Sequence, residues 1–264
     1  MQVIIEECAE KAAKLASLLI RDQMQAKPYT VLGLATGRTM ERLYAKLVKM
    51  HTDKGLDFSK CRTFNLDEYI GLPTDDPHSY RSYMNKHLFS KINIDMNSTH
   101  LPDGMAEDYA SEADRYERLI KESGGIDMQL LGIGRSGHIG FNEPLSALLS
   151  RTRDKGLTQT TIDQNICLFD KPEDMPKRAF TMGIGTILDA RKIVMVATGA
   201  EKADILAKAV EGPVTSMISA TALQLHAATI VIADEDAAQK LEGIDYYHWL
   251  YENEPEWRNY SEQV

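Results

Sequence analysis

Short apolar segments rich in Val, Ile and Leu alternate along the chain with longer amphipathic segments. The apolar segments predict strands at residues 2–5, 29–35, 62–66, 127–133, 192–198 and 228–233. The amphipathic segments predict helices at 8–23, 40–51, 79–91, 106–122, 201–210 and 219–226. This alternation is typical of βα units, so we predict an α/β fold with an open, mostly parallel, doubly wound (Rossmann-like) sheet and helices on both faces.

The chain shows no repeat, low-complexity tract or linker that would divide it. We therefore predict a single domain over residues 1–264. The segment 145–178 is charged and irregular in period. Such a segment suits a mobile lid, and an ordinary surface excursion is the alternative that composition leaves open.

Charge and composition narrow the classes of partner and the cell compartment. The formal net charge of −9 argues against a general nucleic-acid partner, and it means that an anionic substrate needs a locally positive pocket. No apolar run approaches the ~20 residues that span a bilayer, and the first residues lack the basic start of a signal peptide. We expect a soluble, cytoplasmic protein. Cys8, Cys61 and Cys167 lie far apart, so we expect reduced thiols and no metal site.

Polar and glycine residues directly follow the second predicted strand. Val31-Leu32-Gly33-Leu34 leads into Ala35-Thr36-Gly37-Arg38-Thr39 and then into a predicted helix. A strand, a Gly-containing turn and a helix amino end present free N–H groups and hydroxyls to an anion, for which phosphate is the natural candidate. The P-loop pattern is absent, and a plain connection is the alternative. Lys202, at another helix start, could supply positive charge or be a solvated lysine.

The third predicted strand carries its polar residues on one side. Alternation puts Thr63, Asn65 and Asp67 opposite Phe64 and Leu66. Asp67 therefore falls at the end of the strand, where a carboxylate can act as a base on a carbon adjacent to a carbonyl. Glu68 has the parity of the apolar side. A helix cap or a surface ion pair is the alternative for this acidic pair.

The segment from Leu130 to Pro144 is the richest in chemistry. It contains GxGxxG, but a dinucleotide fingerprint should lie in the first βα turn and open a helix, whereas this one comes late in the chain. Its glycines can instead let the backbone approach a small ligand, and a tight loop can bring His138 and Glu143 together. Such a pair can give and take a proton near neutrality, with the carboxylate fixing the tautomer. A structural histidine is the alternative.

Taken together and in this order, these segments resemble the glucosamine-6-phosphate deaminase/isomerase family, from near the start to about residue 240. Residues 63–69 look like the family's enolisation-base motif, and residues 137–144 look like its ring-opening motif. Residues 150–153 and the turn from Gly199 to Lys202 also match. The tail after residue 240 departs from the family, and its aromatic residues 246–249 are either a subunit contact or local packing.

The resemblance implies isomerisation and deamination of an amino sugar phosphate, glucosamine 6-phosphate being the expected substrate. His138, oriented by Glu143, would open the pyranose by moving a proton to the ring oxygen, and Asp67 would then shuttle a proton between C2 and C1. The phosphate would be held by Thr36, Gly37, Arg38, Thr39 and Lys202. The resemblance also implies that no metal or organic cofactor is needed and that the protein is a homo-oligomer.

Three positions of the matching segments depart from the family's pattern. Ser136 stands in the catalytic motif where Asp or Asn is usual, and Cys167 falls where many members carry a phosphate-binding arginine. Arg38 replaces a small residue of the phosphate loop. Some hexameric relatives bind an activating N-acetylated sugar phosphate; Ser146, Arg153 and Lys155 match that site, but Gly156 replaces its Thr, so we do not expect this regulation.

Three alternatives to this function stay open. The same chemistry on galactosamine 6-phosphate would differ by one hydroxyl contact. A regulator that binds a sugar phosphate without catalysis would not need Asp67, His138 and Glu143. A lactonase acting on a phosphorylated sugar acid has a related fold, but the segment Phe64-Asn65-Leu66-Asp67-Glu68-Tyr69 argues against it.

Overall fold

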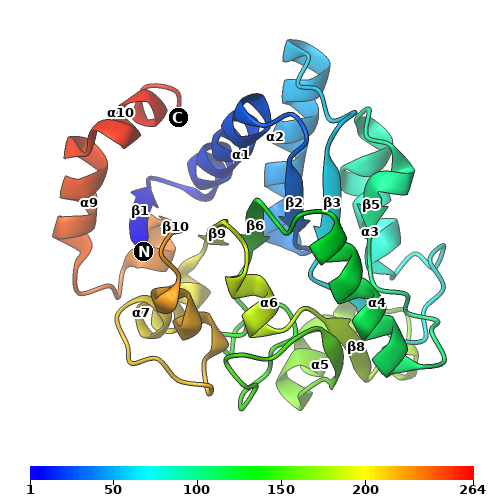
Figure 1. Cartoon of the computed structure of the whole chain (residues 1–264). Coiled ribbons are helices and arrows are strands. Elements are labelled where there is room, and N and C mark those ends of the chain that lie inside the picture. The colour runs from blue at the N-terminus through cyan, green and yellow to red at the C-terminus, as the bar shows by residue number, and fades with distance from the viewer.

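A seven-stranded parallel sheet forms the centre of the molecule in the computed structural model, which describes residues 1–264 (Figure 1). Its spatial order is β1-β10-β9-β6-β2-β3-β5, and every neighbouring pair is parallel. The strands are β1 (Gln2–Glu6), β2 (Val31–Leu34), β3 (Arg62–Asn65), β5 (Thr99–His100), β6 (Met128–Leu131), β9 (Lys192–Ala197) and β10 (Thr229–Asp234). All six predicted strands are confirmed. The short edge strand β5 was not predicted, because two residues carry no periodicity.

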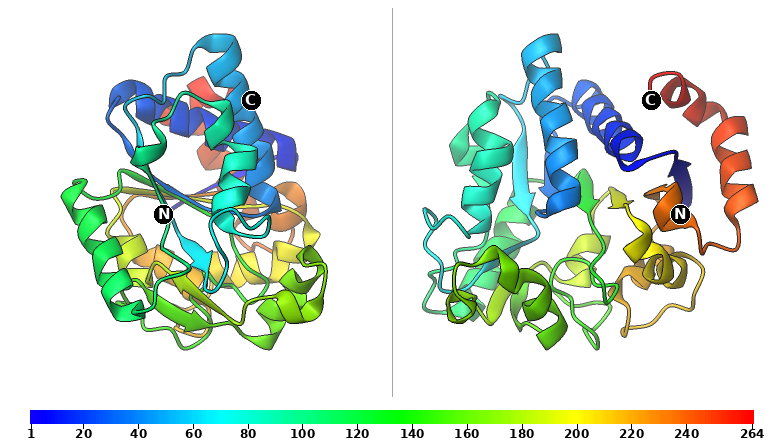
Figure 2. Two further views of the ribbon diagram at one scale, coloured as in Figure 1. Left: turned by 90° about the vertical axis from the view of Figure 1, so that its right-hand side faces the viewer. Right: turned by 180° about the vertical axis from the view of Figure 1, so that it is seen from behind.

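Helices cover both faces of this sheet, which confirms the predicted α/β class (Figures 1 and 2). The helices are α1 (Ala9–Ala26), α2 (Arg38–Lys54), α3 (Tyr80–His87), α4 (Tyr109–Glu122), α5 (Gln159–Asn165), α6 (Ile184–Leu188), α7 (Ala203–Val210), α8 (Glu235–Ala238), α9 (Ile244–Asn253) and α10 (Pro255–Ser261). Short 3₁₀ helices lie at Phe89–Lys91, Met96–Ser98, Ile166–Leu168, Pro172–Asp174, Ala200–Lys202 and Ser219–Leu225. None of the helices combines the length and the apolar composition that a membrane-spanning segment requires.

The predicted α-helix at 219–226 is wrong in type, because Ser219–Leu225 is a 3₁₀ helix. Hydroxyl side chains at its start compete with the α-helical pattern. Ser219 Oγ donates to the Asn142 carbonyl, and Thr221 Oγ1 lies 2.7 Å from the Ile218 carbonyl. Ser and Thr side chains that bond to nearby backbone in this way oppose regular α-helix. The other predicted helices correspond to α1, α2, α3, α4 and α7.

A second, three-stranded antiparallel sheet lies beyond the carboxyl ends of the parallel strands. It has the order β4-β8-β7, with β4 (Asp67–Tyr69), β8 (Arg178–Thr181) and β7 (Arg153–Gly156). Leu66 separates β3 from β4 and bonds to both sheets, since its N–H donates to Leu34 and its carbonyl accepts from Met182. The prediction that Asp67 ends the third strand is therefore wrong. Asp67 instead begins β4, where it pairs with Thr181.

The segment 145–178 contains β7, α5 and two of the 3₁₀ helices. Its inner side packs in a small apolar cluster that joins Phe169 and Met175 to Tyr69 and Phe141. Its aromatic packing is specific, since the Phe169 ring lies 5.8 Å from Tyr69 and stacks on His78 at 4.7 Å. These contacts place the segment over β4 and over the loop that holds Phe141.

The tail after residue 240 forms two helices that no pattern predicted. Helix α9 lies beside β1, and α10 packs against α9 (Figures 1 and 2). Trp257 is buried, and the Tyr251 hydroxyl donates to Glu6 at 2.7 Å. These residues pack locally. Tyr246 and Trp249 remain 60% and 54% exposed and stack on each other, so the two alternatives for residues 246–249 stay open.

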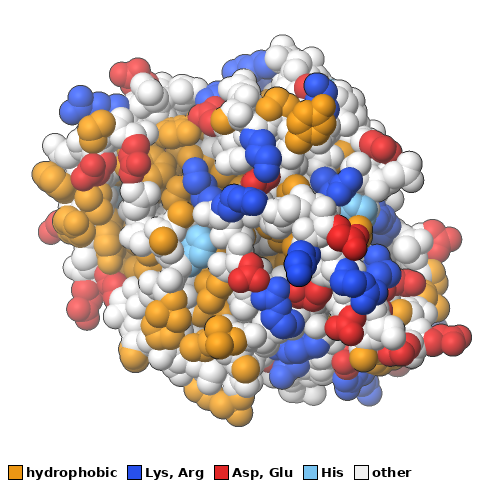
Figure 3. All heavy atoms as spheres, in the orientation of Figure 1, with side chains coloured by type: hydrophobic (Ala, Val, Ile, Leu, Met, Phe, Trp, Pro, Cys, Tyr) orange, Lys and Arg blue, Asp and Glu red, His pale blue; other side chains and the backbone are white.

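Charged and apolar side chains divide the molecular surface unevenly. On the face shown in Figure 3, Lys and Arg side chains lie among Asp and Glu side chains over the half that contains α4. Apolar side chains gather toward the end that contains α9. Although the net charge is −9, acidic and basic side chains are mixed on this face.

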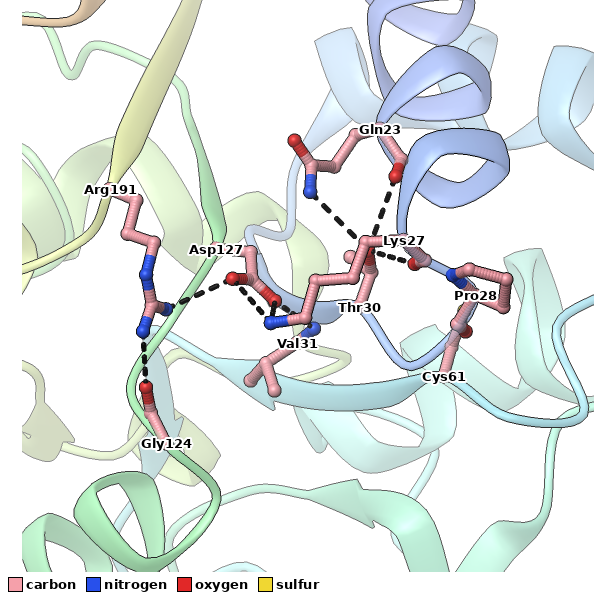
Figure 4. Close-up of polar contacts among 9 residues, drawn as sticks. All are labelled: Gln23, Lys27, Pro28, Thr30, Val31, Cys61, Gly124, Asp127 and Arg191. Atoms are coloured by element: carbon pink, nitrogen blue, oxygen red, sulfur yellow. Dashed lines mark hydrogen bonds and ion pairs between the residues drawn. The ribbon is translucent and has the colours of Figure 1, made fainter.

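One buried carboxylate joins the amino ends of three parallel strands (Figure 4). Asp127, only 3% exposed, precedes β6 and accepts hydrogen bonds from Lys27 (2.7 Å), Arg191 (2.9 Å) and the Val31 N–H (2.9 Å). Val31 begins β2 and Arg191 precedes β9. A single side chain thus ties β2, β6 and β9 together at the end of the sheet opposite the antiparallel strands.

We expect Asp127→Ala to lower the free energy of unfolding by about 2–4 kcal/mol, because a buried N–H loses its acceptor and two charge-assisted bonds disappear. Urea denaturation followed by circular dichroism measures the change. Asp204→Ala is the matched control, since it breaks an exposed ion pair with Lys240 and should leave stability unchanged. Equal stability of the two variants would contradict the role of Asp127.

Candidate active site

The chain order of the parallel sheet reverses between β2 and β6. From β2 the chain continues to β3 and β5 on one side, and from β6 it continues to β9 and β10 on the other. The loops that leave the two strands diverge at such a point and open a crevice, which is where ligands bind in open α/β sheets. The phosphate-loop candidate follows β2, and the loop with His138 follows β6, so both border this crevice.

The loop after β2 has the form of an anion site. Gly37 has φ of +118°, a conformation that favours glycine, and α2 begins at the next residue. The Gly37 carbonyl is held by the Tyr83 hydroxyl at 2.8 Å. The N–H groups of Arg38 and Thr39, the first two residues of this 17-residue helix, have no intrahelical partner, whereas the Met40 N–H donates to the Gly37 carbonyl. Thr36 and Thr39 flank these free N–H groups, and the exposed Arg38 side chain makes no hydrogen bond.

Glycines shape the loop after β6 around the His138 ring. A Cβ atom on Gly134 would lie 2.1 Å from His138 Nε2, so only glycine leaves room for the imidazole. The Gly134 N–H donates to the His138 carbonyl at 2.9 Å, and Gly137 and Gly140 have positive φ. The glycines were predicted to let the backbone approach a small ligand. At Gly134 the group that the backbone approaches closely is the His138 ring of the same loop.

His138 has two partners on one ring nitrogen. Its Nδ1 lies 2.8 Å from Ser136 Oγ and 3.4 Å from Glu143 Oε2. The predicted convergence of His138 and Glu143 is present, although 3.4 Å is long for a hydrogen bond. Ser136, which the sequence placed in the same group, makes the shorter contact.

The Glu143 carboxylate is buried and ionised. Burial favours its neutral form, but the neighbouring His138 and the hydrogen bonds from Thr161 and the Thr158 N–H outweigh burial and lower the pKa of Glu143 to about 2. Glu143 is therefore a fixed negative charge beside the imidazole at neutral pH. A carboxylate in this position stabilises the protonated ring and orients it.

Asp67 lies close to the same loop, at Gly140. Its Oδ2 is 3.5 Å from the point where a Cβ on Gly140 would stand, and its strand partner Thr181 accepts the Phe141 N–H. Burial, together with the charge of Glu68, raises the pKa of Asp67 to about 8. The structure thus brings Asp67, 71 positions before His138 in the chain, close to Gly140 of the loop that carries His138.

Glu68 has a different task, as its opposite parity suggested. Its carboxylate accepts the N–H groups of Tyr69, Tyr80 and Arg81, at 2.8–2.9 Å. Two of these residues begin α3. The helix-cap alternative therefore holds for Glu68 and not for Asp67, whose oxygens accept no hydrogen bond.

Lys202 borders the crevice from the side of β9. Its Nζ donates to the Ile133 carbonyl at 2.9 Å, in the loop after β6, and burial lowers the pKa of Lys202. It is thus not a freely solvated lysine. Cys167 is exposed on the 145–178 segment, and its Sγ contacts only the Gln164 carbonyl. No three His, Cys, Asp or Glu side chains are grouped so that they could hold a metal ion.

Sequence reasoning missed two threonines at this site. Thr161 donates to Glu143 Oε1 from α5, and the Thr158 N–H lies 3.4 Å from the same oxygen. Thr158 and Thr161 have the spacing of a helix N-cap, which the structure confirms, so the start of α5 was readable. The contact of these threonines with Glu143 could not be predicted from the sequence, because it depends on how a long loop folds back.

Comparison with known proteins gives consistent relatives. Residues 5–232 match the family model described as glucosamine-6-phosphate isomerases/6-phosphogluconolactonase. A glucosamine-6-phosphate deaminase of Hahella chejuensis is 52% identical over 250 residues, which cover 95% of each chain. The enzyme of that name from Cellvibrio japonicus is 49% identical, with 93% of each chain covered.

Solved structures extend the similarity. A monomeric glucosamine-6-phosphate deaminase superposes with a TM-score of 0.89 at 41% identity, covering 91% of this chain and 100% of that chain. A 6-phosphogluconolactonase from Leishmania guyanensis superposes with a TM-score of 0.70 at 20% identity, covering 90% of this chain and 97% of that chain. The second likeness is one of fold alone.

We expect Asp67→Asn to stabilise the protein increasingly as pH rises from 5 to 8. An acid whose folded pKa is raised keeps its full contribution to stability below its unfolded pKa of 3.8, and loses it as pH rises through the folded pKa of about 8. An amide does not titrate. The variant should therefore gain roughly 2–4 kcal/mol over the wild type across this range.

Urea denaturation at several pH values measures this difference. Asp114→Asn, an exposed aspartate of α4, is the control and should track the wild type at every pH. If Asp67→Asn also runs parallel to the wild type between pH 5 and 8, the Asp67 carboxyl is not held in its neutral form.

Proposed function

The chain belongs to the glucosamine-6-phosphate isomerase/6-phosphogluconolactonase family, and on that premise we propose that it converts glucosamine 6-phosphate and water into fructose 6-phosphate and ammonia. The observation that carries the proposal is the convergence of Asp67 and the His138–Glu143 pair on one loop beside the reversal point of the sheet. Binding alone requires no such set of acids and bases. The relatives at 49–52% identity carry the same activity in their names.

His138 and Glu143 supply the ring-opening step of this mechanism. The imidazole takes the proton of the anomeric hydroxyl and delivers a proton to the ring oxygen, so that the pyranose opens to the aldehyde form. Positive charge forms on the imidazole between these transfers, and the ionised Glu143 beside Nδ1 stabilises it. Ser136 Oγ, 2.8 Å from the same nitrogen, orients the ring.

Asp67 supplies the isomerisation step. Its carboxylate removes the C2 proton, which leaves an enolamine, and returns a proton to C1 to give an imine at C2. Water adds to the imine, ammonia leaves, and the ketose phosphate remains. A pKa of about 8 makes Asp67 a strong enough base for a carbon acid. The ammonium group of the bound substrate favours the ionised carboxylate, since an opposite charge lowers the pKa of an acid.

The substrate phosphate is assigned to the opposite flank of the crevice. Free N–H groups at the start of α2, the hydroxyls of Thr36 and Thr39, and the Arg38 side chain lie on this flank, and Lys202 would reach the phosphate from the side of β9. Gly37 lets the loop turn there. A protein with a net charge of −9 needs such a local cluster of donors to bind a phosphate monoester. Lys202 would exchange its bond to Ile133 for one to phosphate.

The 145–178 segment is proposed as the lid of the site, within a single domain that spans the chain. Its inner aromatic and polar residues contact Tyr69 and Glu143, one from each reacting segment. A covering segment of this kind excludes water from the enolamine. We also propose a cytoplasmic location and a homo-oligomer; gel filtration with light scattering tests the latter, and a mass near 29.6 kDa would contradict it.

Ammonia release from glucosamine 6-phosphate is the direct test of the proposed function. The wild type should release ammonia together with an equal amount of fructose 6-phosphate, without added metal or cofactor. Asp67→Asn should reduce turnover by at least about 10³-fold while substrate binding persists, because an amide keeps the shape but accepts no proton.

Two further substrates separate the alternatives. Faster release from galactosamine 6-phosphate would assign the galacto epimer, and hydrolysis of 6-phosphogluconolactone without ammonia release would assign a lactonase. Binding of glucosamine 6-phosphate without any product would leave a regulator. Near-normal turnover by Asp67→Asn would remove Asp67 from the mechanism.

Arg38 is expected to hold the phosphate in place of the lid arginine that Cys167 replaces. Arg38→Ala should raise KM for the sugar phosphate about 10–100-fold with a smaller effect on kcat, because a remote phosphate is held alike in ground and transition states. Adding Cys167→Arg should restore much of the affinity. Steady-state kinetics with Arg42→Ala as the control, an exposed arginine of the same helix, measures this. An unchanged KM in Arg38→Ala would refute it.

A further inference from the structure

The two oxygens of the Glu143 carboxylate have different surroundings. Oε1 accepts the Thr161 hydroxyl at 2.5 Å and lies 3.4 Å from the Thr158 N–H. Oε2 faces His138 Nδ1 at 3.4 Å and has no hydrogen-bond partner. The hydrogen bond that fixes the orientation of the carboxylate therefore comes from α5 and not from the histidine that it serves.

The same short helix also contacts the segment that carries Asp67. Asn165 Nδ2 donates to the Tyr69 hydroxyl at 3.2 Å, and Tyr69 lies two residues after Asp67 in β4. Thr161 and Asn165 are four residues apart, so they share one face of α5. One face of this helix thus touches both segments to which the proposed reaction assigns its acids and bases.

We propose that Thr161 is a positioning residue for Glu143, so that docking of the 145–178 segment assembles the His138–Glu143 pair. This inference rests on the proposed function. The Thr161 hydroxyl fixes Oε1, and the rigid carboxylate then directs Oε2 at His138. Without that bond the carboxylate can rotate away, and the imidazole loses the negative charge that steadies its protonated form.

Thr161→Val tests the hydroxyl with little disturbance of the helix. Thr161 is 1% exposed, and valine keeps its branched shape. The N-cap of α5 survives the change, because the Thr161 N–H still donates to Thr158 Oγ1. Thr160→Val is the matched control, since Thr160 is exposed on the same helix and undergoes the same change. Thr161→Ser restores the hydroxyl.

The kinetic arm follows ammonia release from glucosamine 6-phosphate. We expect kcat/KM to fall about 10–100-fold in Thr161→Val, to recover to within about threefold in Thr161→Ser, and to stay at the wild-type value in Thr160→Val. Glucitol 6-phosphate, an acyclic polyol phosphate, has no ring to open, so its inhibition constant should stay within about twofold in all variants. An inhibition constant that rises in step with the loss of kcat/KM would reduce Thr161 to a structural residue and overturn the inference.

The spectroscopic arm uses the free protein and does not depend on the reaction. The ring-nitrogen resonances of His138 report its tautomer and protonation across a pH titration. They should change in Thr161→Val and match the wild type in Thr161→Ser and Thr160→Val. Unchanged resonances in Thr161→Val would overturn the inference even if the wild type releases ammonia. If the wild type releases no ammonia but the His138 resonances still differ between Thr161→Val and the wild type, the proposed function is overturned and the positioning role of Thr161 stands.

Discussion

The parallel pairing of β2 with β6 is the constraint on which the rest of the site depends. The chain leaves these strands in opposite directions, so their carboxyl ends open a crevice that backbone alone cannot fill. The start of α2 contributes unpaired N–H groups on one flank. The glycine loop after β6 contributes the imidazole on the other. At the opposite, amino end of these strands, Asp127 links β2, β6 and β9 through its hydrogen bonds. These bonds fix the positions of the strands that border the crevice.

The pKa values of two buried carboxylates near this crevice are shifted in opposite directions. Burial, together with the charge of Glu68, raises the pKa of Asp67 to about 8, and no hydrogen bond to its carboxylate opposes this. Glu143 is buried too, but His138 and two donors from the 145–178 segment lower its pKa to about 2. The proposed mechanism uses the first carboxylate as the base toward a carbon acid and the second as the counter-charge for an imidazole. Their division of labour follows from the donors around them, because both are carboxylates.

The small antiparallel sheet connects these environments. β4 carries Asp67, β8 supplies Thr181 to the loop of His138, and β7 leads into α5 with its threonines. A break at Leu66 turns the chain from the parallel sheet into this second sheet. Asp67 therefore belongs to the antiparallel sheet, and the segment that follows β7 in the same sheet contacts Glu143 through Thr161.

The sequence by itself predicted six of the seven parallel strands, five of the helices and the residues of the candidate site. Buried strands need continuous apolar runs, and residues that follow such strands meet at one edge, so Thr36, Asp67, His138 and Lys202 were found from local pattern and resemblance. Only the tertiary structure decided that Asp67 begins a strand of another sheet, that the predicted helix at 219–226 is a 3₁₀ helix, and that α9 packs beside β1 with α10 against α9. It also decided that Thr161 holds Glu143. These features rest on contacts between segments far apart in the chain, whose geometry no local periodicity records.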